Sequence, residues 1–135
     1  MSYRSGIKGA IPIDRMASEI AKALNEWSQD VADATKKAVV ETTAEAVLEL
    51  KRNSPRDSGA YARDWDRKTL ETSRYGIRNV VYNKKHYRLT HLLEHGHANA
   101  RGGGRTPAYP HIGIAEARAM EMLQEKTERY IHDVD

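Results

Sequence analysis

The chain changes character at Asn53-Ser54-Pro55-Arg56-Asp57-Ser58-Gly59-Ala60-Tyr61. Pro55 cannot lie inside a helix, because it has no N–H to donate and its ring clashes with the preceding turn. Asp57 and Gly59 then favour a sharp turn, since Asp offers a side-chain acceptor and Gly tolerates a positive φ. Helical periodicity precedes this stretch, whereas most of the sequence that follows, up to residue 111, has the pattern of strands and loops. The stretch therefore predicts a boundary between a helical part and a β-containing part.

Before this boundary, residues 13–53 are predicted to form one long helix. No Gly or Pro interrupts them, and apolar residues recur every three or four positions. The helix would be roughly 60 Å long at about 1.5 Å per residue, whereas a compact chain of this size has a diameter of about 37 Å. One end would therefore extend past its own domain, and we expect Trp27 and Val31 on the apolar face to lie at an interface. A break near residues 39–43, where β-branched side chains cluster, stays open as the alternative.

After the boundary, the pattern predicts an α+β fold in a single domain, residues 1–135. Its elements would be a small antiparallel sheet, a short helix that ends at Gly96, and a C-terminal helix, with both helices packed on the sheet. The expected segments are an N-terminal arm (1–12), the long helix (13–53), a β-hairpin region (60–83), a basic and Gly-rich loop region (84–111) and the C-terminal helix (113–132).

Composition narrows the function classes. The 135 residues include no cysteine, which removes disulfides and Cys-type zinc sites. The N-terminal sequence lacks the apolar region of an export signal, and no apolar run approaches membrane-spanning length. We therefore expect a soluble protein that is not exported.

Basic residues concentrate between residues 84 and 111. This span holds five lysines and arginines against one acid, a net +4, so the rest of the chain sums to −1 although the total is +3. We expect an acidic partner or a phosphate backbone to meet this region first. Three consecutive glycines, residues 102–104, predict a mobile loop in the free protein. The candidate contact residues are Lys84, Lys85, Arg101 and Arg105. A DNA-binding module using this region stays open as an alternative, and its affinity would fall as salt rises.

The stretch His91-Leu92-Leu93-Glu94-His95 matches the H-x-x-E-H pattern of inverted zincins. On a helix, the two histidines would share a face, and Glu94 could act as a base beside a metal-bound water. The candidates for a third ligand are His97, His111 and Glu116. A small zinc-dependent hydrolase is therefore the alternative function. Against it, the helix would end at Gly96, directly after the motif, whereas a catalytic site needs rigid support.

The order of motifs resembles a known family. Asp57-Ser58-Gly59 follows the long helix, Glu94-His95-Gly96-His97 follows the strands, and Pro110-His111-Ile112-Gly113-Ile114-Ala115 leads into the last helix. The chain resembles the minor tail-component proteins of long-tailed bacteriophages, the neck or head–tail joining group. Those proteins have a Pro-x-Asp-Thr-Gly motif, a Glu-aromatic-Gly-Thr motif and a Pro-Phe-Leu-x-Pro-Ala segment. Here Ser replaces Thr in the first motif, His replaces the aromatic residue and Thr in the second, and Phe is absent from the third. The resemblance spans about residues 45–120.

The resemblance implies a non-enzymatic structural protein of the virion that assembles in the host cytoplasm and needs no cofactor. It implies a homo-oligomeric ring, sixfold or twelvefold, at the head–tail junction, with a connector, tail completion or terminator role. The partners would be copies of itself, head-closure or adaptor proteins, tail-tube or tail-terminator proteins, and the genomic DNA passing through the lumen, with no membrane. The resemblance assigns structural positions to the motif residues Pro55, Asp57, Gly59, Glu94, Gly96 and Pro110.

Overall fold

The computed structural model describes residues 13–56, 58–99 and 102–134, with the side chains of residues 13 and 14 excepted. The expected N-terminal arm, Asp57 and Arg101 lie outside the described residues. The elements are α1 (Ile13–Asn53), α2 (Ala60–Arg63), β1 (Trp65–Thr72), β2 (Ile77–Asn83), α3 (Tyr87–His95), β3 (His97–Ala98), β4 (Arg105–Thr106) and α4 (Ile112–His132). This element order confirms the predicted α+β class.

Helix α1 is continuous, so the alternative of a break near residues 39–43 is wrong. Two threonine hydroxyls of this helix bond back to its own backbone, and one of them, that of Thr43, lies within residues 39–43. Thr35 Oγ1 donates to Val31 O at 2.9 Å and Thr43 Oγ1 to Val39 O at 2.6 Å, the back-bonding that lets threonine stay in a helix interior. The helix ends before Pro55, where the backbone N–H of Ser54 donates to Leu50 O at 3.0 Å.

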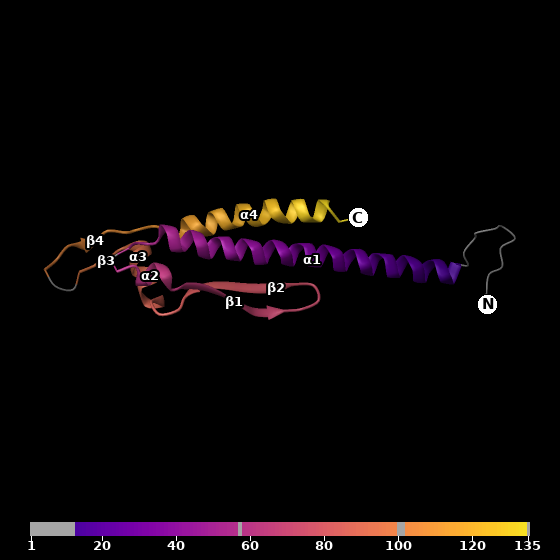
Figure 1. Cartoon of the computed structure of the whole chain (residues 1–135), viewed down its shortest axis with the longest axis horizontal. Coiled ribbons are helices and arrows are strands. Elements are labelled where there is room, and N and C mark those ends of the chain that lie inside the picture. Colours follow the sequence, from indigo (N-terminus) through magenta and orange to yellow (C-terminus); the bar gives the residue numbers. More distant parts are fainter. Residues whose placement is uncertain (1–12, 57, 100–101, 135) are drawn as a thin grey trace.

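Strands β1 and β2 form an antiparallel hairpin whose register runs from Trp65↔Asn83 to Thr72↔Ile77, with an irregularity between Thr69 and Glu71. The hairpin lies along one side of α1 (Figure 1). Its tip is tied to the middle of that helix, because Arg74 Nε donates to Gln29 Oε1 at 2.7 Å and Arg74 Nη2 to Asn25 Oδ1 at 3.0 Å. The hairpin therefore reaches back along α1 as far as Asn25.

Helix α4 packs antiparallel on the opposite side of α1 (Figure 1). Salt bridges join Arg118 to Glu49, and Lys126 to Glu41 at 3.3 Å. Here the structure differs from the expected arrangement, in which the C-terminal helix packed on the sheet. The difference follows from sheet size, because a two-stranded sheet offers one narrow inner face, and α1 already covers it. Only the first turn of α4 reaches the base of the hairpin.

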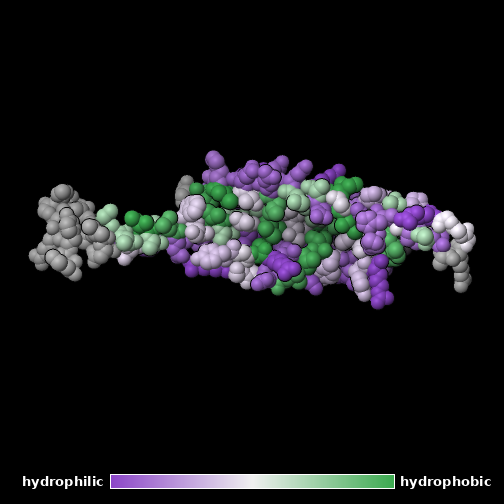
Figure 2. Space-filling model, turned by 180° about the vertical axis from the view of Figure 1, so that it is seen from behind, coloured by the Kyte–Doolittle hydropathy of each residue, from purple (hydrophilic) through white to green (hydrophobic). Residues whose placement is uncertain are grey.

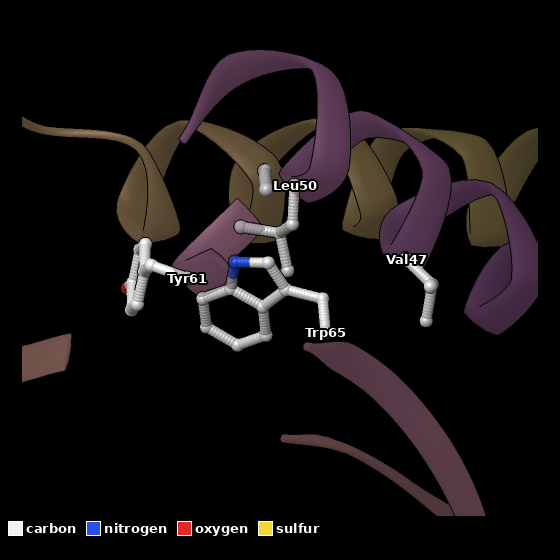
Figure 3. Packing of buried hydrophobic residues seen from close by; sticks show 5 residues of the cluster. Val47, Leu50, Tyr61 and Trp65 are labelled. Carbon is white, nitrogen blue, oxygen red and sulfur yellow. The ribbon is translucent and has the colours of Figure 1, made fainter. Parts of the chain in front are cut away.

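The core is small and lies near the boundary stretch. It consists of Val47 and Leu50 of α1, Tyr61 of α2, Trp65 of β1 and Ala115 of α4 (Figure 3). Trp65 is 4% exposed and its indole Nε1 donates to Ser54 Oγ at 2.7 Å. No large side chain among the described residues is completely buried. Within the described residues, no helix has both the length and the apolar character needed to cross a membrane.

Candidate assembly interface

A turn, a helix cap and a buried hydrogen-bond network hold the two ends of the β-containing part together. Gly59 has φ 87°, in the left-handed region that suits glycine, and it starts the turn into α2. Tyr61, two residues later, shares a hydrogen bond of 2.8 Å with His111 Nε2, and His111 Nδ1 lies 2.7 Å from Tyr109 O. Burial, followed by the nearby Glu94 charge, raises the pKa of the Tyr61 hydroxyl to about 12. The boundary stretch is thus joined to the start of α4.

Glu94 caps helix α4 from a different helix. Its Oε1 accepts the backbone N–H groups of His111 at 2.8 Å and Ile112 at 2.7 Å, and its Oε2 accepts that of Gly113 at 3.0 Å. These are the free donors of a helix N-terminus, which also favours a negative charge. Burial alone would raise the pKa of the Glu94 carboxyl, but the backbone donors and His111 outweigh it, and the pKa is lowered. The carboxylate is a structural clamp between α3 and α4.

Gly96 lets the chain turn tightly after α3. Its φ is 71°, and a Cβ atom there would lie 2.6 Å from Thr106 O and 2.9 Å from Ala108 N. Tyr109 N donates to Leu93 O at 2.7 Å, so the segment before α4 runs back against α3. The close approach of two backbones explains the glycine. Pro110, which is exposed, precedes the capped start of α4.

The H-x-x-E-H motif does not form a zincin arrangement within the described residues. His91 and His95 are exposed and their ring centroids lie 4.8 Å apart, but Glu94 points to the α4 N-terminus instead of toward them. His111, one of the candidates for a third ligand, is buried beside Tyr61. Among the described residues, no group of three potential metal ligands comes together.

Three of the predicted basic contact residues, Lys84, Lys85 and Arg105, are described, and they flank α3 in the chain, far from the N-terminal end of α1 (Figure 1). Lys84 lies 3.9 Å from Asp66 and Lys85 is exposed, both at the end of the hairpin. Arg105 begins β4, where its Nη2 donates to His95 O at 3.2 Å. Part of the expected loop is a short β3–β4 ladder whose turn includes glycines 102–104, all with positive φ.

Trp27 and Val31 share the apolar face of α1, whose N-terminal part extends past the end of α4 (Figure 1). Trp27 is 53% exposed, and Val31 is partly buried. All described residues from 15 to 27 are exposed. The same face includes Met16, Ile20 and Leu24, each about half exposed. We call these four residues, Met16, Ile20, Leu24 and Trp27, the uncovered stripe; Figure 2 shows hydrophobic residues on this thin end of the molecule.

The stripe continues the face that α4 covers elsewhere. Thr42, Ala46 and Glu49 of α1 line a pocket with residues of α4. Steps of three or four residues lead from Thr42 back through Ala38 and Val31 to the stripe, so all of them share one side of the helix. The α4 helix ends at His132, and Tyr130 bonds to Glu41, while α1 continues past the end of α4 (Figure 1). The length of α4 therefore leaves the stripe uncovered.

The accessible surface is large for a chain of this mass. It measures 10142 Å² for 15.3 kDa. If the first twelve residues are set aside at the extended-chain bound of about 1.45 Å² per dalton, about 8,300 Å² remains, against about 6,700 Å² for a compact monomer of the remaining mass. The excess is about 1,600 Å², and two patches of a standard protein interface would cover it, since each partner there buries about 800 Å².

The fold has a long helix, a small core and a motif glutamate that caps a helix, features that suit a structural protein. Over residues 18–96 the chain matches the family model described as "Bacteriophage HK97-gp10, putative tail-component". The chain belongs to this HK97-gp10-like family and is a structural tail component of a bacteriophage virion. The match confirms the resemblance to phage tail components. No curated protein and no solved structure matches the chain.

Proposed function

We propose that the protein forms an oligomeric ring at the head–tail junction of the phage particle, in a connector, tail completion or terminator role. The observation that carries this proposal is the uncovered stripe, with about 1,600 Å² of surface beyond what a compact monomer exposes. Burying four half-exposed large apolar side chains favours an interface, at about 25 cal/mol per Å² before the entropy cost of association is subtracted. Membership of a tail-component family supports the location in the particle.

In this proposal the two ends of the molecule have different partners. The stripe lies at one end and meets another copy, which makes a heterologous contact of the kind that closes into rings. The basic residues around α3 lie at the other end and meet acidic surfaces of adjacent head-closure, adaptor or tail-tube proteins, or the backbone of the DNA in the lumen. The proposed ring is sixfold or twelvefold, as the family resemblance implies.

Electron microscopy of the purified protein and labelling of intact particles test the proposal. We expect rings in solution at high protein concentration and the label at the junction of head and tail. In a phage lacking the natural gene copy, a variant with Arg101→Glu and Arg105→Glu should be made at normal levels but leave heads and tails unjoined. Labels found only on the distal tail, or normal yields of infectious particles from this variant, would contradict the proposal. The matched control is Arg129→Glu, an exposed arginine near the end of α4.

A further inference from the structure

An apolar groove lies where α1, α4 and the hairpin meet. Its lining includes Leu50 and Trp65 of the core, Val81 of β2, three alanines and two further residues of α4, Ile112 and Glu116; the alanines are Ala46, Ala115 and Ala119. Glu116 is acidic and lies on the α4 side, opposite the basic hairpin. The groove has a volume of about 270 Å³, enough for one or two large side chains. The alanines on α1 and α4 leave room for another helix to approach closely. Nothing among the described residues of the same chain fills it.

The uncovered stripe supplies side chains that suit this groove. Met16, Ile20, Leu24 and Trp27 project from a single helix, and helix-in-groove contacts use anchors at this spacing. A copy cannot use its own stripe to fill its own groove. Ala119 lines a pocket with Glu45 and Glu49, which lie about 32 and about 38 Å along α1 from Leu24. The occupant must therefore come from a second chain.

The distribution of charge favours docking of the stripe in the groove of another copy over packing of two stripes against each other. Residues 15–33 carry two basic and four acidic residues, a net −2, whereas residues 64–88 of the hairpin and its exit carry seven basic and three acidic residues, a net +4. Arg67, the cross-strand neighbour of Val81 in the groove wall, has no ion pair among the described residues. Two stripes packed together would bring like charges into contact, which is destabilising. The helix end and the hairpin side attract each other.

We infer that the uncovered stripe of one copy docks in the groove between α1, α4 and the hairpin of the next copy. The contact rests on the proposed ring and specifies which surfaces build it. It is head-to-tail, because every copy offers a stripe at one end and a groove at the other. The acidic side of the helix end, with Glu26 and Asp30, then faces the basic hairpin wall. The small residues on its other side, Ala21 and Ser28, face α4.

Disulfide cross-linking tests this contact directly, because the chain contains no cysteine of its own. A variant with Leu24→Cys and Ala119→Cys in one chain should give a ladder of covalent dimers, trimers and higher oligomers on mild oxidation. Each single-cysteine variant alone should remain monomeric on a denaturing gel, and a mixture of the two should give only dimers. Dimers from Leu24→Cys alone would show stripe-to-stripe pairing and overturn the inference, as would the absence of any ladder.

A second pair of variants checks the contact without cross-linking. Leu24→Glu should reduce the assembly to a single 15.3 kDa species by light scattering. Its circular dichroism should be unchanged, and so should its melting temperature at a protein concentration low enough for the natural chain to be monomeric, since Leu24 is 59% exposed. The matched control, Met120→Glu, changes an apolar residue of α4 that is 66% exposed and outside the groove lining. It should assemble as the natural chain does. Assembly that survives Leu24→Glu, or is equally lost in Met120→Glu, overturns the inference.

These results are separable from the proposed function. A cross-linked ladder from a protein that is absent from the head–tail junction would support the contact and contradict the location. A protein that labels the junction but gives no ladder would support the function and overturn the contact.

Discussion

Glu94→Gln tests the helix clamp at the start of α4. The substitution keeps the side-chain shape and removes the charge. An amide oxygen can still accept from His111 and Ile112, but the new NH₂ group faces the N–H of Gly113, so two donors oppose each other. Hydrogen bonds to a charged group contribute about 1.5–3 kcal/mol each, and the outer one is exposed to water. We therefore expect Glu94→Gln to lower the free energy of unfolding by about 2 kcal/mol, and Glu94→Ala by about 3 kcal/mol.

The pH dependence gives the sharper measurement. The pKa of Glu94 is lowered in the folded chain, so its stabilisation is complete above the unfolded pKa of about 4.3 and is lost as the pH falls through the folded value. The natural chain and Glu94→Gln should therefore differ most at neutral pH and converge in acid. Urea unfolding at pH 7 and at several values down to about 3 measures this, at equal and low protein concentration because association would add stability.

Two results would refute the reasoning. A difference at pH 7 of less than about 0.5 kcal/mol, the scatter of ordinary surface substitutions, would show that the three backbone donors find other partners. A difference in the free energy of unfolding between the natural chain and Glu94→Gln that stays constant at all pH values would show that the effect arises from packing and that the charge contributes nothing.

Three further predictions concern a tight turn, the uncovered stripe and the core. Gly96→Ala should lower the free energy of unfolding by about 2–3 kcal/mol, because the site has a positive φ and the added Cβ would lie 2.6 Å from a backbone oxygen. The control Gly102→Ala, at a site with a positive φ but open space, should lower it by about 1 kcal/mol. Equal losses in the two variants would contradict the steric explanation. In the monomer, iodide should quench the fluorescence of the exposed Trp27, measured in a Trp65→Phe variant, far more than that of the buried Trp65, measured in a Trp27→Phe variant. Equal quenching would show that Trp27 is shielded from solvent. Stability should also fall as the pH rises from about 10 towards 12, because Tyr61 ionises first in the unfolded chain; in Tyr61→Phe this loss should be smaller, and an unchanged alkaline profile would count against the buried hydroxyl.

The local elements could be predicted from the sequence because their signals are local. The absence of Gly and Pro over residues 13–53 predicted the long helix, and Gly96 predicted where the short helix ends. The same kind of pattern could not show which helix face is covered. Trp27 and Ala38 belong to the same helical repeat of apolar residues. Trp27 is exposed and Ala38 is buried because of the length and direction of α4, which the repeat does not reveal.

Short sequence motifs could not predict the long-range contacts of the candidate site. The H-x-x-E-H pattern favours Glu94 as a base beside a metal, and the family resemblance gives it a structural position. Its role as a cap depends on the angle at which α3 meets α4, which neither pattern contains. The Tyr61–His111 contact joins residues fifty positions apart, and a single sequence contains no signal for such a pair. One usable signal existed. Helix α4 has no acidic residue in its own first turn, so a carboxylate from another element was needed to complement its N-terminus.

Helix α1 runs without interruption from its uncovered end to the core residues Val47 and Leu50. It is therefore a stiff rod anchored at one end, and it fixes the direction in which its free end points. In a ring built by such rods, the inclination between neighbouring copies would be set by that direction, and the number of copies that closes the circle would follow from it. A glycine pair placed in the rod between residues 33 and 37 would loosen the inclination and yield circles of mixed size from an otherwise intact protein.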